Sequence, residues 1–163
     1  MRTGKRQGLV VNILNLHHAY RVSERLIKKL AYYILKNQLK LPCAELSFVF
    51  LTDRKIKALN KRYKNEDRPT DVLSFDLSAD RVRRNSPLMG EIIISIDKAR
   101  KNSKIFATGF EEEFVLYIIH GILHLSGYDD ESSKERARME SKQREILKVL
   151  CKRENLSKVL TPR

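Results

Sequence analysis

Hydrophobic positions along this 163-residue chain alternate with polar ones in some segments and recur at helical spacing in others. Four short segments have the pattern of strands, namely residues 9–14, 45–52, 71–77 and 91–96. In the second of these, Leu46, Phe48 and Phe50 alternate with other residues, which predicts a strand. The fourth follows Gly90 and contains three consecutive isoleucines, a run that indicates burial on both faces of a sheet.

Helical spacing and helix-start signals occur between these strands. Ser23 is the expected N-cap of a first helix, whose apolar positions are Leu26, Ile27, Leu30, Ile34 and Leu35. Asp53 is the expected cap of a basic amphipathic helix that buries Ile56, Leu59 and Tyr63. A short basic helix is expected from about Asp97.

The next helix has the most apolar body in the chain. Thr108 with Glu111 forms a capping-box pattern at its start. Residues 114–125 are apolar almost all round, which predicts a central, buried helix. Gly127 is suited to end it, because a residue with positive φ commonly follows a helix.

The end of the chain predicts one more helix. Ser132 with Glu135 forms another capping-box pattern, and the helix is expected to run to about Lys152. Residues 1–8 and about 153–163 are expected to be loose tails.

Together these elements predict an α+β fold with a single domain over residues 1–163. It should contain a small mixed sheet of about four strands packed with about five helices. A polar, arginine-rich loop is expected over residues 79–87. The sequence contains no internal repeat, low-complexity tract or linker that would divide the chain.

The charge balance indicates a polyanionic partner. Lysine and arginine number 33 against 20 acidic residues, a formal net charge of +13. One basic cluster consists of Arg54, Lys55, Lys57, Lys61, Arg62, Lys64 and Arg68. A basic surface can also serve solubility, but this excess in so small a domain is typical of nucleic-acid binding. Charge alone does not identify a reaction.

Cysteine content and hydropathy indicate a cytoplasmic protein. Cys43 and Cys151 are far apart and lack zinc-site spacing, so we expect a reduced compartment and no disulfide-linked partner. Residues 114–125 are too short for a membrane span and contain two histidines. Residues 9–16 are too short and too polar for a secretory signal. We therefore expect no membrane association.

Two histidines four residues apart lie inside the apolar helix. His120 and His124 share one helix face, about one turn apart, which suits joint coordination of a metal. Two unpartnered imidazoles would be costly to bury there. Gly127 follows where the helix must end, and Asp130 lies at the sixth position after His124, where the returning chain can meet the same ion. This H-x-x-x-H-x-x-G-x-x-[H/D] spacing is that of the metzincin zinc site.

This pattern predicts one divalent metal ion, zinc, bound by His120, His124 and Asp130 on the central buried helix. Three protein ligands leave a coordination position open, as in catalytic zinc sites, where the ion acidifies a water and polarises the bond to be cut. Zinc peptidases place a glutamate base directly after the first histidine. Here that position is Gly121, which has no side chain to act as a base, so a standard peptidase mechanism is not expected.

Three blocks of the chain match the signatures of a known family. The first is His120-Gly-x-Leu-His124-Leu-x-Gly127-Tyr128-Asp129. The second is Asn60-x-x-Tyr63-x-x-x-Asp67-x-Pro69-Thr70-Asp71-Val72-Leu73-Ser74-Phe75. The third is the strand start Gly90-Glu91-Ile92. In content and order these blocks resemble the YbeY family of metal-dependent endoribonucleases, and the similarity extends over about residues 9–150.

The resemblance implies more than the residues alone do. It implies an α+β fold, a single metal usually taken to be zinc, and hydrolysis of single-stranded RNA. It also implies a role in rRNA processing, especially maturation of the 3′ end of small-subunit rRNA, and in ribosome quality control. The ribosomal small subunit is the implied partner.

The chain departs from the family pattern at three positions. The third ligand is usually histidine, whereas Asp130 adds a negative charge that should acidify a bound water less and shift preference towards harder metals. The arginine that usually follows the tyrosine of the second block is Lys64, which keeps the charge but loses the bidentate grip on phosphate. Asp76 stands where proline is common. The predicted catalytic residues are His120 and, through the resemblance, Lys64.

Several points remain open at the level of sequence. RNA is expected in a basic groove, held mainly through its phosphates. Asp71, Glu91 and Asp129 are all candidates for the general base. Tyr63 and Phe75 are expected in the core rather than as stacking platforms for bases. Two alternative functions are a metzincin-like zinc peptidase and a non-catalytic ribosome assembly factor or RNA chaperone with a structural metal.

Overall fold

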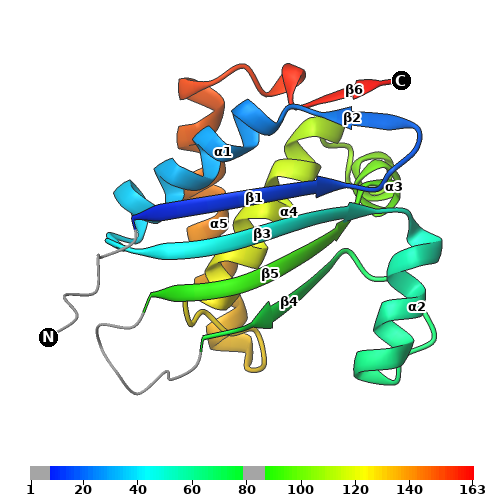
Figure 1. Ribbon diagram of the computed structural model, residues 1–163, viewed down its shortest axis with the longest axis horizontal. Coiled ribbons are helices and arrows are strands. Elements are labelled where there is room, and N and C mark those ends of the chain that lie inside the picture. The colour runs from blue at the N-terminus through cyan, green and yellow to red at the C-terminus, as the bar shows by residue number, and fades with distance from the viewer. Residues whose placement is uncertain (1–7, 79–86) are drawn as a thin grey trace, which may run out of the picture.

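The computed structural model describes residues 8–78 and 87–163, and Figure 1 shows a sheet with helices behind it. The strands are β1 (Leu9–Asn15), β2 (Tyr20–Val22), β3 (Ala44–Leu51), β4 (Val72–Asp76), β5 (Leu88–Ser95) and β6 (Leu160–Pro162). The α-helices are α1 (Glu24–Tyr33), α2 (Asp53–Lys64), α3 (Ile96–Phe106), α4 (Phe110–Leu125) and α5 (Ser133–Arg153). A π-helical turn, Ile34–Gln38, follows α1, and a 3-10 turn, Leu156–Lys158, precedes β6.

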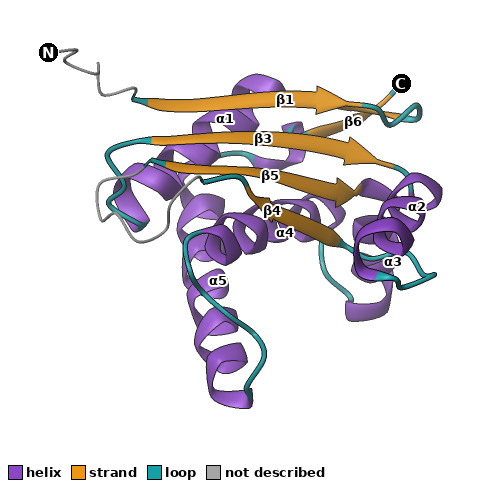
Figure 2. Cartoon of the chain, turned by 60° about the horizontal axis from the view of Figure 1, so that its bottom comes forward, coloured by secondary structure: helices purple, strands orange, loops and turns teal. Residues whose placement is uncertain are grey.

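The main sheet is mixed and has the strand order β1-β3-β5-β4. Strands β1, β3 and β5 are parallel, and β4 is antiparallel to β5 at one edge. Figure 2 shows α1, α4 and α5 on one side of this sheet, with α2 beyond the end of the strands. Over the described residues, the predicted α+β class with a four-stranded mixed sheet and five α-helices is confirmed.

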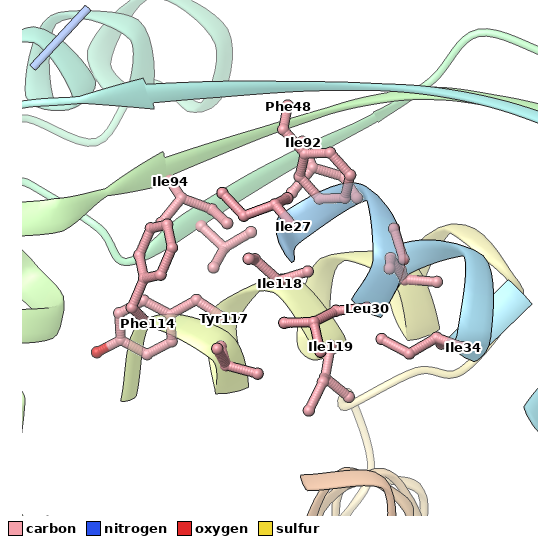
Figure 3. Packing of buried hydrophobic residues seen from close by; sticks show 14 of the residues in the cluster. Ile27, Leu30, Ile34, Phe48, Ile92, Ile94, Phe114, Tyr117, Ile118 and Ile119 are labelled. Atoms are coloured by element: carbon pink, nitrogen blue, oxygen red, sulfur yellow. The ribbon is translucent and has the colours of Figure 1, made fainter. Parts of the chain in front are cut away.

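The core lies between this sheet and α4. Ile92 and Ile94 of β5 are fully buried, and both belong to one cluster with Phe114 and Ile118 of α4 (Figure 3). Because side chains alternate along a strand, these two isoleucines share the face of β5 that meets α4. The all-round apolar body of α4 is explained by its place between the sheet, α1, α3 and α5.

Gly121 allows α4 to approach the sheet closely. A Cβ atom added at this position would lie 2.5 Å from a methyl carbon of Ile92, which is itself fully buried. Ile92 is β-branched and held by the core, so it has little freedom to move away. The position that holds the glutamate base in zinc peptidases therefore has no space for a side chain in this fold.

Replacing Gly121 with alanine is expected to destabilise the protein, although alanine is the better helix former. Overpacking should outweigh the gain in helix propensity and leave a net loss of about 2 kcal/mol. Urea unfolding of the metal-free protein measures this loss. In an Ile92→Ala background the clash is removed, so the same substitution should be neutral or stabilising. An equal loss in both backgrounds would contradict the close approach.

Several predicted helix boundaries are confirmed. The hydroxyl of Ser23 accepts a hydrogen bond from Leu26 N–H, and Ser132 with Glu135 forms a reciprocal capping box at α5. Gly127 has a φ of 109° directly after the C-cap of α4, as a helix-ending glycine should. These signals depend on neighbours within a few residues, which is why sequence reveals them.

Two predicted caps are wrong. Thr52, not Asp53, caps α2, and the Asp53 carboxylate instead accepts hydrogen bonds from the Ser95 hydroxyl and the Lys101 ammonium. Helix α4 begins after Gly109 without a side-chain cap, because the Thr108 hydroxyl donates to Glu113 at 2.8 Å. In both places the expected local bond is replaced by a contact that the local pattern does not reveal.

The predicted loose C-terminal tail is also wrong. Strand β6 pairs with β2 in a second, two-stranded antiparallel sheet. Leu156, Val159 and Leu160 are buried, so this segment closes part of the core. The two strands have three residues each and are far apart in sequence, and so neither has a local signal of pairing. The predicted N-terminal tail and the 79–87 loop fall almost wholly outside the described residues.

Cys43 and Cys151 are both free thiols. Across residues 8–78 and 87–163, none of the helices combines the length and the apolar character needed to cross a bilayer.

Candidate metal centre

The end of helix α4 turns the chain back towards its own histidines. Tyr128 N–H donates to the carbonyl of Leu123 at 3.0 Å, and Gly127 N–H donates to that of His124 at 3.2 Å. This pair of bonds, with positive φ at Gly127, is a Schellman motif, which reverses the chain directly after a helix. The reversal carries Asp130 back to the face of α4 that holds His120 and His124.

Two further hydrogen bonds fix the returning segment. The Asp129 carboxylate accepts from Asp130 N–H at 2.7 Å, and the Arg136 guanidinium donates to the Asp130 carbonyl at 3.2 Å. The first bond gives Asp129 the role of a turn former. The backbone of Asp130, which carries the carboxylate, is thus hydrogen-bonded at both its amide and its carbonyl.

The structure brings the three predicted ligands together. Their candidate ligand atoms all lie within 4.8 Å of one another, and His124 Nε2 is 3.6 Å from Asp130 Oδ1. Zinc bonds of about 2.0–2.1 Å in a tetrahedron place ligand atoms about 3.4 Å apart, so the widest gap closes with small side-chain rotations. The residues therefore fit a divalent ion. The side chains of His124 and Asp130 are 33% and 45% exposed, so solvent and substrate can reach this group.

His120 is oriented by a residue that the sequence did not single out. Its Nδ1 lies 3.1 Å from the side-chain amide of Gln143, a buried residue of α5. This bond leaves Nε2 as the ring atom available to an ion. An ion bound at Nε2 requires that Nδ1 carry the ring proton. The side-chain oxygen of Gln143 accepts a hydrogen bond from this N–H when the amide is turned by 180°. Gln143 lies in a charged stretch of α5 with no local feature that marks it as a partner of His120.

The ionisation of His120 also suits metal binding. Burial, assisted by the neighbouring His124, lowers the pKa of His120 below its ordinary value, and nearby Asp71 opposes this only in part. The imidazole is therefore neutral at neutral pH. A neutral ring keeps the lone pair that a metal ligand must donate.

A polar cavity of about 390 Å³ opens beside the three ligands. Lys64, the last residue of α2, lines it together with Ser74 and Asp71. Lys64 therefore lies in the same cavity as the histidines, where the family resemblance predicts it. The Ser74 hydroxyl is buried and has no hydrogen-bond partner among the described residues. It is a donor that the sequence analysis missed and that a bound oxyanion or water could use.

The structure separates the three candidates for the general base. Asp71 and Asp129 line the polar cavity, whereas Glu91 lines a depression on the other side of the main sheet. Alternation along β5 explains this, because Glu91 and Ile93 point away from α4 when Ile92 and Ile94 point towards it. Glu91 is thus remote from the ligand group.

Tyr63 is not a core residue, contrary to the expectation from helical spacing. It is 57% exposed at the end of α2. Phe75, which is partly buried, meets it edge-on with ring centroids 5.2 Å apart. Helix α2 lies at the end of the sheet, so only the stripe around Ile56 is covered.

A second cavity, of about 510 Å³, also has His120 in its lining. It is lined by residues of α3, α4 and α5, and we call it the α3–α5 cavity. Asp71, His120 and Asp130 line both this cavity and the polar one. The ligand group therefore stands at the junction of two cavities.

Comparison with known proteins identifies the family. A sequence profile described as Endoribonuclease YbeY matches residues 12–151. This chain belongs to the YbeY family. A relative from Geobacter sulfurreducens, named Endoribonuclease YbeY, is 36% identical over 143 residues, which is 86% of this chain and 95% of the relative. Another of that name, from Petrotoga mobilis, is 35% identical over 128 residues, 78% of this chain and 85% of its own length.

A solved structure agrees with this assignment. The solution structure of TM1509 from Thermotoga maritima superposes with a TM-score of 0.62 at 28% identity, covering 88% of this chain and 91% of that one. The family predicted from the sequence is confirmed. Both relatives are named as endoribonucleases, which is the enzyme class predicted for this chain. The three candidate ligands and Lys64 all fall inside the matched range.

Proposed function

We propose that this chain is a metal-dependent endoribonuclease that cleaves single-stranded RNA during rRNA processing. The observation that carries this proposal is the convergence of two imidazoles and a carboxylate at a solvent-accessible cavity that also holds a lysine. Membership of the YbeY family supports RNA as the substrate. The net charge of +13 agrees with a polyanion that is held through its phosphates.

The proposed cofactor is one zinc ion, with His120, His124 and Asp130 as its ligands. Imidazole and carboxylate donors suit zinc, and three of them leave a position open to substrate. When bound, the ion supplies Lewis-acid stabilisation of charge and lowers the pKa of a coordinated water. With its amide turned so that the oxygen faces Nδ1, Gln143 would hold His120 in the tautomer that this binding needs.

The other residues of the polar cavity act on the RNA itself. The Lys64 ammonium is placed to neutralise charge that develops on the phosphate being cleaved. The Ser74 hydroxyl can donate a hydrogen bond to a phosphate oxygen. Of the three general-base candidates, Asp71 and Asp129 line this cavity and could accept a proton from the attacking water. The exposed basic residues of α2 extend this surface towards the rest of the strand.

Family membership also supports a cellular setting. We propose maturation of the 3′ end of small-subunit rRNA and ribosome quality control as the processes, with the ribosomal small subunit as partner. The proposed location is the cytoplasm, and the two free thiols fit a reducing compartment. A zinc peptidase with its usual base is disfavoured, because Gly121 packs against Ile92 and leaves no space for a glutamate.

The test compares three substrates under two metal conditions. Purified protein, stripped with a chelator or reloaded with zinc, is incubated with a single-stranded RNA, a duplex of the same sequence and an unfolded protein. We expect cleavage of the single strand alone, and a rate at least about 100-fold lower without metal. Cleavage of the protein alone would favour the peptidase. RNA binding without cleavage by the loaded protein would favour the assembly factor.

A further inference from the structure

The α3–α5 cavity adjoins the candidate metal centre and shares part of its lining with the polar cavity. Both cavities reach His120 and Asp130, but their linings differ in chemistry. The polar cavity is lined mainly by carboxylates, hydroxyls and a lysine. The α3–α5 cavity has a wall of Phe106, Leu116, Tyr117 and Met139. A ligand that spans both would match these linings with a charged part next to an apolar part.

We propose that the α3–α5 cavity binds the base of the nucleotide adjoining the phosphate that is cleaved. The inference rests on the proposed function and deepens it, because a ribonucleotide joins a charged phosphate to a planar base. A volume of about 510 Å³ is in the range of small-ligand sites. The base lies in this cavity while its phosphate lies at the junction beside His120.

Neutral polar groups in the lining of the cavity can recognise a base edge. Burial raises the pKa of Tyr117, so its phenol stays protonated. The Asn102 amide nitrogen donates to that phenol at 2.7 Å, which orients the Asn102 carbonyl oxygen as an acceptor. Gln143 contributes a second amide to the lining. In single-stranded RNA, base edges present donors and acceptors that amides can match.

Charge keeps the phosphates out of the interior. Asp71, Glu113 and Glu140 line the cavity and disfavour an anion inside it, whereas Lys64 and the proposed zinc ion offset the carboxylates of the polar cavity. A neutral base carries no such penalty. Arg136 and Arg144 also line it, and both are exposed along α5. These guanidiniums can bind the next phosphate of the strand at the rim. The distribution favours a base inside and backbone outside.

Phe106 provides the stacking surface at the mouth of the cavity. It is the last residue of α3 and is 62% exposed, although it is aromatic. Aromatic rings exposed beside a nucleic-acid groove commonly stack on unpaired bases. The preceding residue, Ile105, is 72% exposed and does not line the cavity. Ile105 and Phe106 are thus adjacent exposed apolar residues, and only Phe106 is predicted to contact RNA.

The first experiment measures binding without metal or catalysis. NMR titration of the metal-free protein compares a ribonucleoside 5′-monophosphate with ribose 5-phosphate. We expect shifts at Tyr117 and Leu116 with the nucleotide alone, and Phe106→Ala to weaken its binding about 5- to 100-fold. Ile105→Ala should leave the affinity within about two-fold. Equal effects of the two substitutions, or no base-dependent shift at millimolar nucleotide, would overturn the proposal.

The second experiment locates the base relative to the cut. An abasic residue is placed at successive positions of a single-stranded RNA, and cleavage by the zinc-loaded protein is measured. We expect one flanking position to lower kcat/KM about tenfold in the unsubstituted protein and to have little effect in Phe106→Ala. If RNA is cleaved with no such dependence, the proposed cavity role fails while the proposed function stands. If nucleotides bind as expected but RNA is not cleaved, the proposed function fails and only the binding of a base in the cavity stands.

Discussion

Replacing His120 with alanine is expected to slow cleavage of single-stranded RNA by about a thousand-fold, because charge stabilisation by a bound metal is worth several kcal/mol. His120 is the most constrained of the three candidate ligands. It is a half-buried residue of α4, its Nδ1 lies beside the Gln143 amide, and its lowered pKa keeps the ring neutral. Removing it leaves His124 and Asp130 as the two remaining members of the candidate ligand group. Initial rates on a single-stranded RNA, with zinc in excess, measure the effect.

A matched histidine outside the site provides the control. His18 is exposed in the turn between β1 and β2, so His18→Ala should keep full activity. Thermal unfolding adds a readout that a contaminating nuclease cannot produce. Zinc should raise the Tm of the unsubstituted protein and of His18→Ala, and raise that of His120→Ala much less. Undiminished cleavage by pure His120→Ala protein would mean that the metal is not catalytic.

Replacing Asp130 with alanine is expected to weaken zinc binding by about 100-fold or more. Removing a residue that hydrogen-bonds to a metal ligand typically weakens metal binding by up to about 100-fold. Removing the ligand itself should weaken metal binding at least as much. Asp130 is the proposed ligand that stands where the family resemblance implies a histidine, and its oxygen lies 3.6 Å from His124 Nε2. Asp130→Asn keeps the shape and removes the charge, so it should also bind zinc weakly. Chelator competition and elemental analysis of the purified proteins measure both.

Glu131 supplies the comparison for Asp130. It is the next residue, it also lines the polar cavity and it is exposed, but it is not part of the ligand group. Glu131→Gln should therefore retain zinc at the affinity of the unsubstituted protein. Stoichiometric zinc with unchanged affinity in Asp130→Ala would remove Asp130 from the proposed ligand set, whatever the activity of the variant.

Much of the candidate site could be predicted because its signals are local. Helix periodicity places His120 and His124 on one face, and the glycine at 127 ends the helix within one turn of the second histidine. The Schellman bonds that follow span six residues, so the return of Asp130 is encoded in a short segment. The N-caps at Ser23 and Ser132 are equally local and were predicted correctly.

Predictions failed where contacts with residues distant in sequence replaced the structure that the local pattern favours. The carboxylate of Asp53 is drawn to Ser95 and Lys101, more than 40 residues away, and Thr52 takes the cap. Tyr63 has the right spacing for a buried stripe, but α2 lies beyond the end of the strands and leaves it exposed. Strands β6 and β2 pair although they lie near opposite ends of the sequence.

The sequence by itself determined the family, the identity of the candidate ligands and the helix that carries two of them, because residue type, spacing and helix termination are properties of neighbouring residues. Only the tertiary structure decided that Gln143 orients His120, that Glu91 faces away from the site and that Gly121 has no space for a side chain. It alone also showed a second cavity between α3, α4 and α5. These features arise where elements distant in sequence pack together, and the free energy of that packing is not encoded in any single segment.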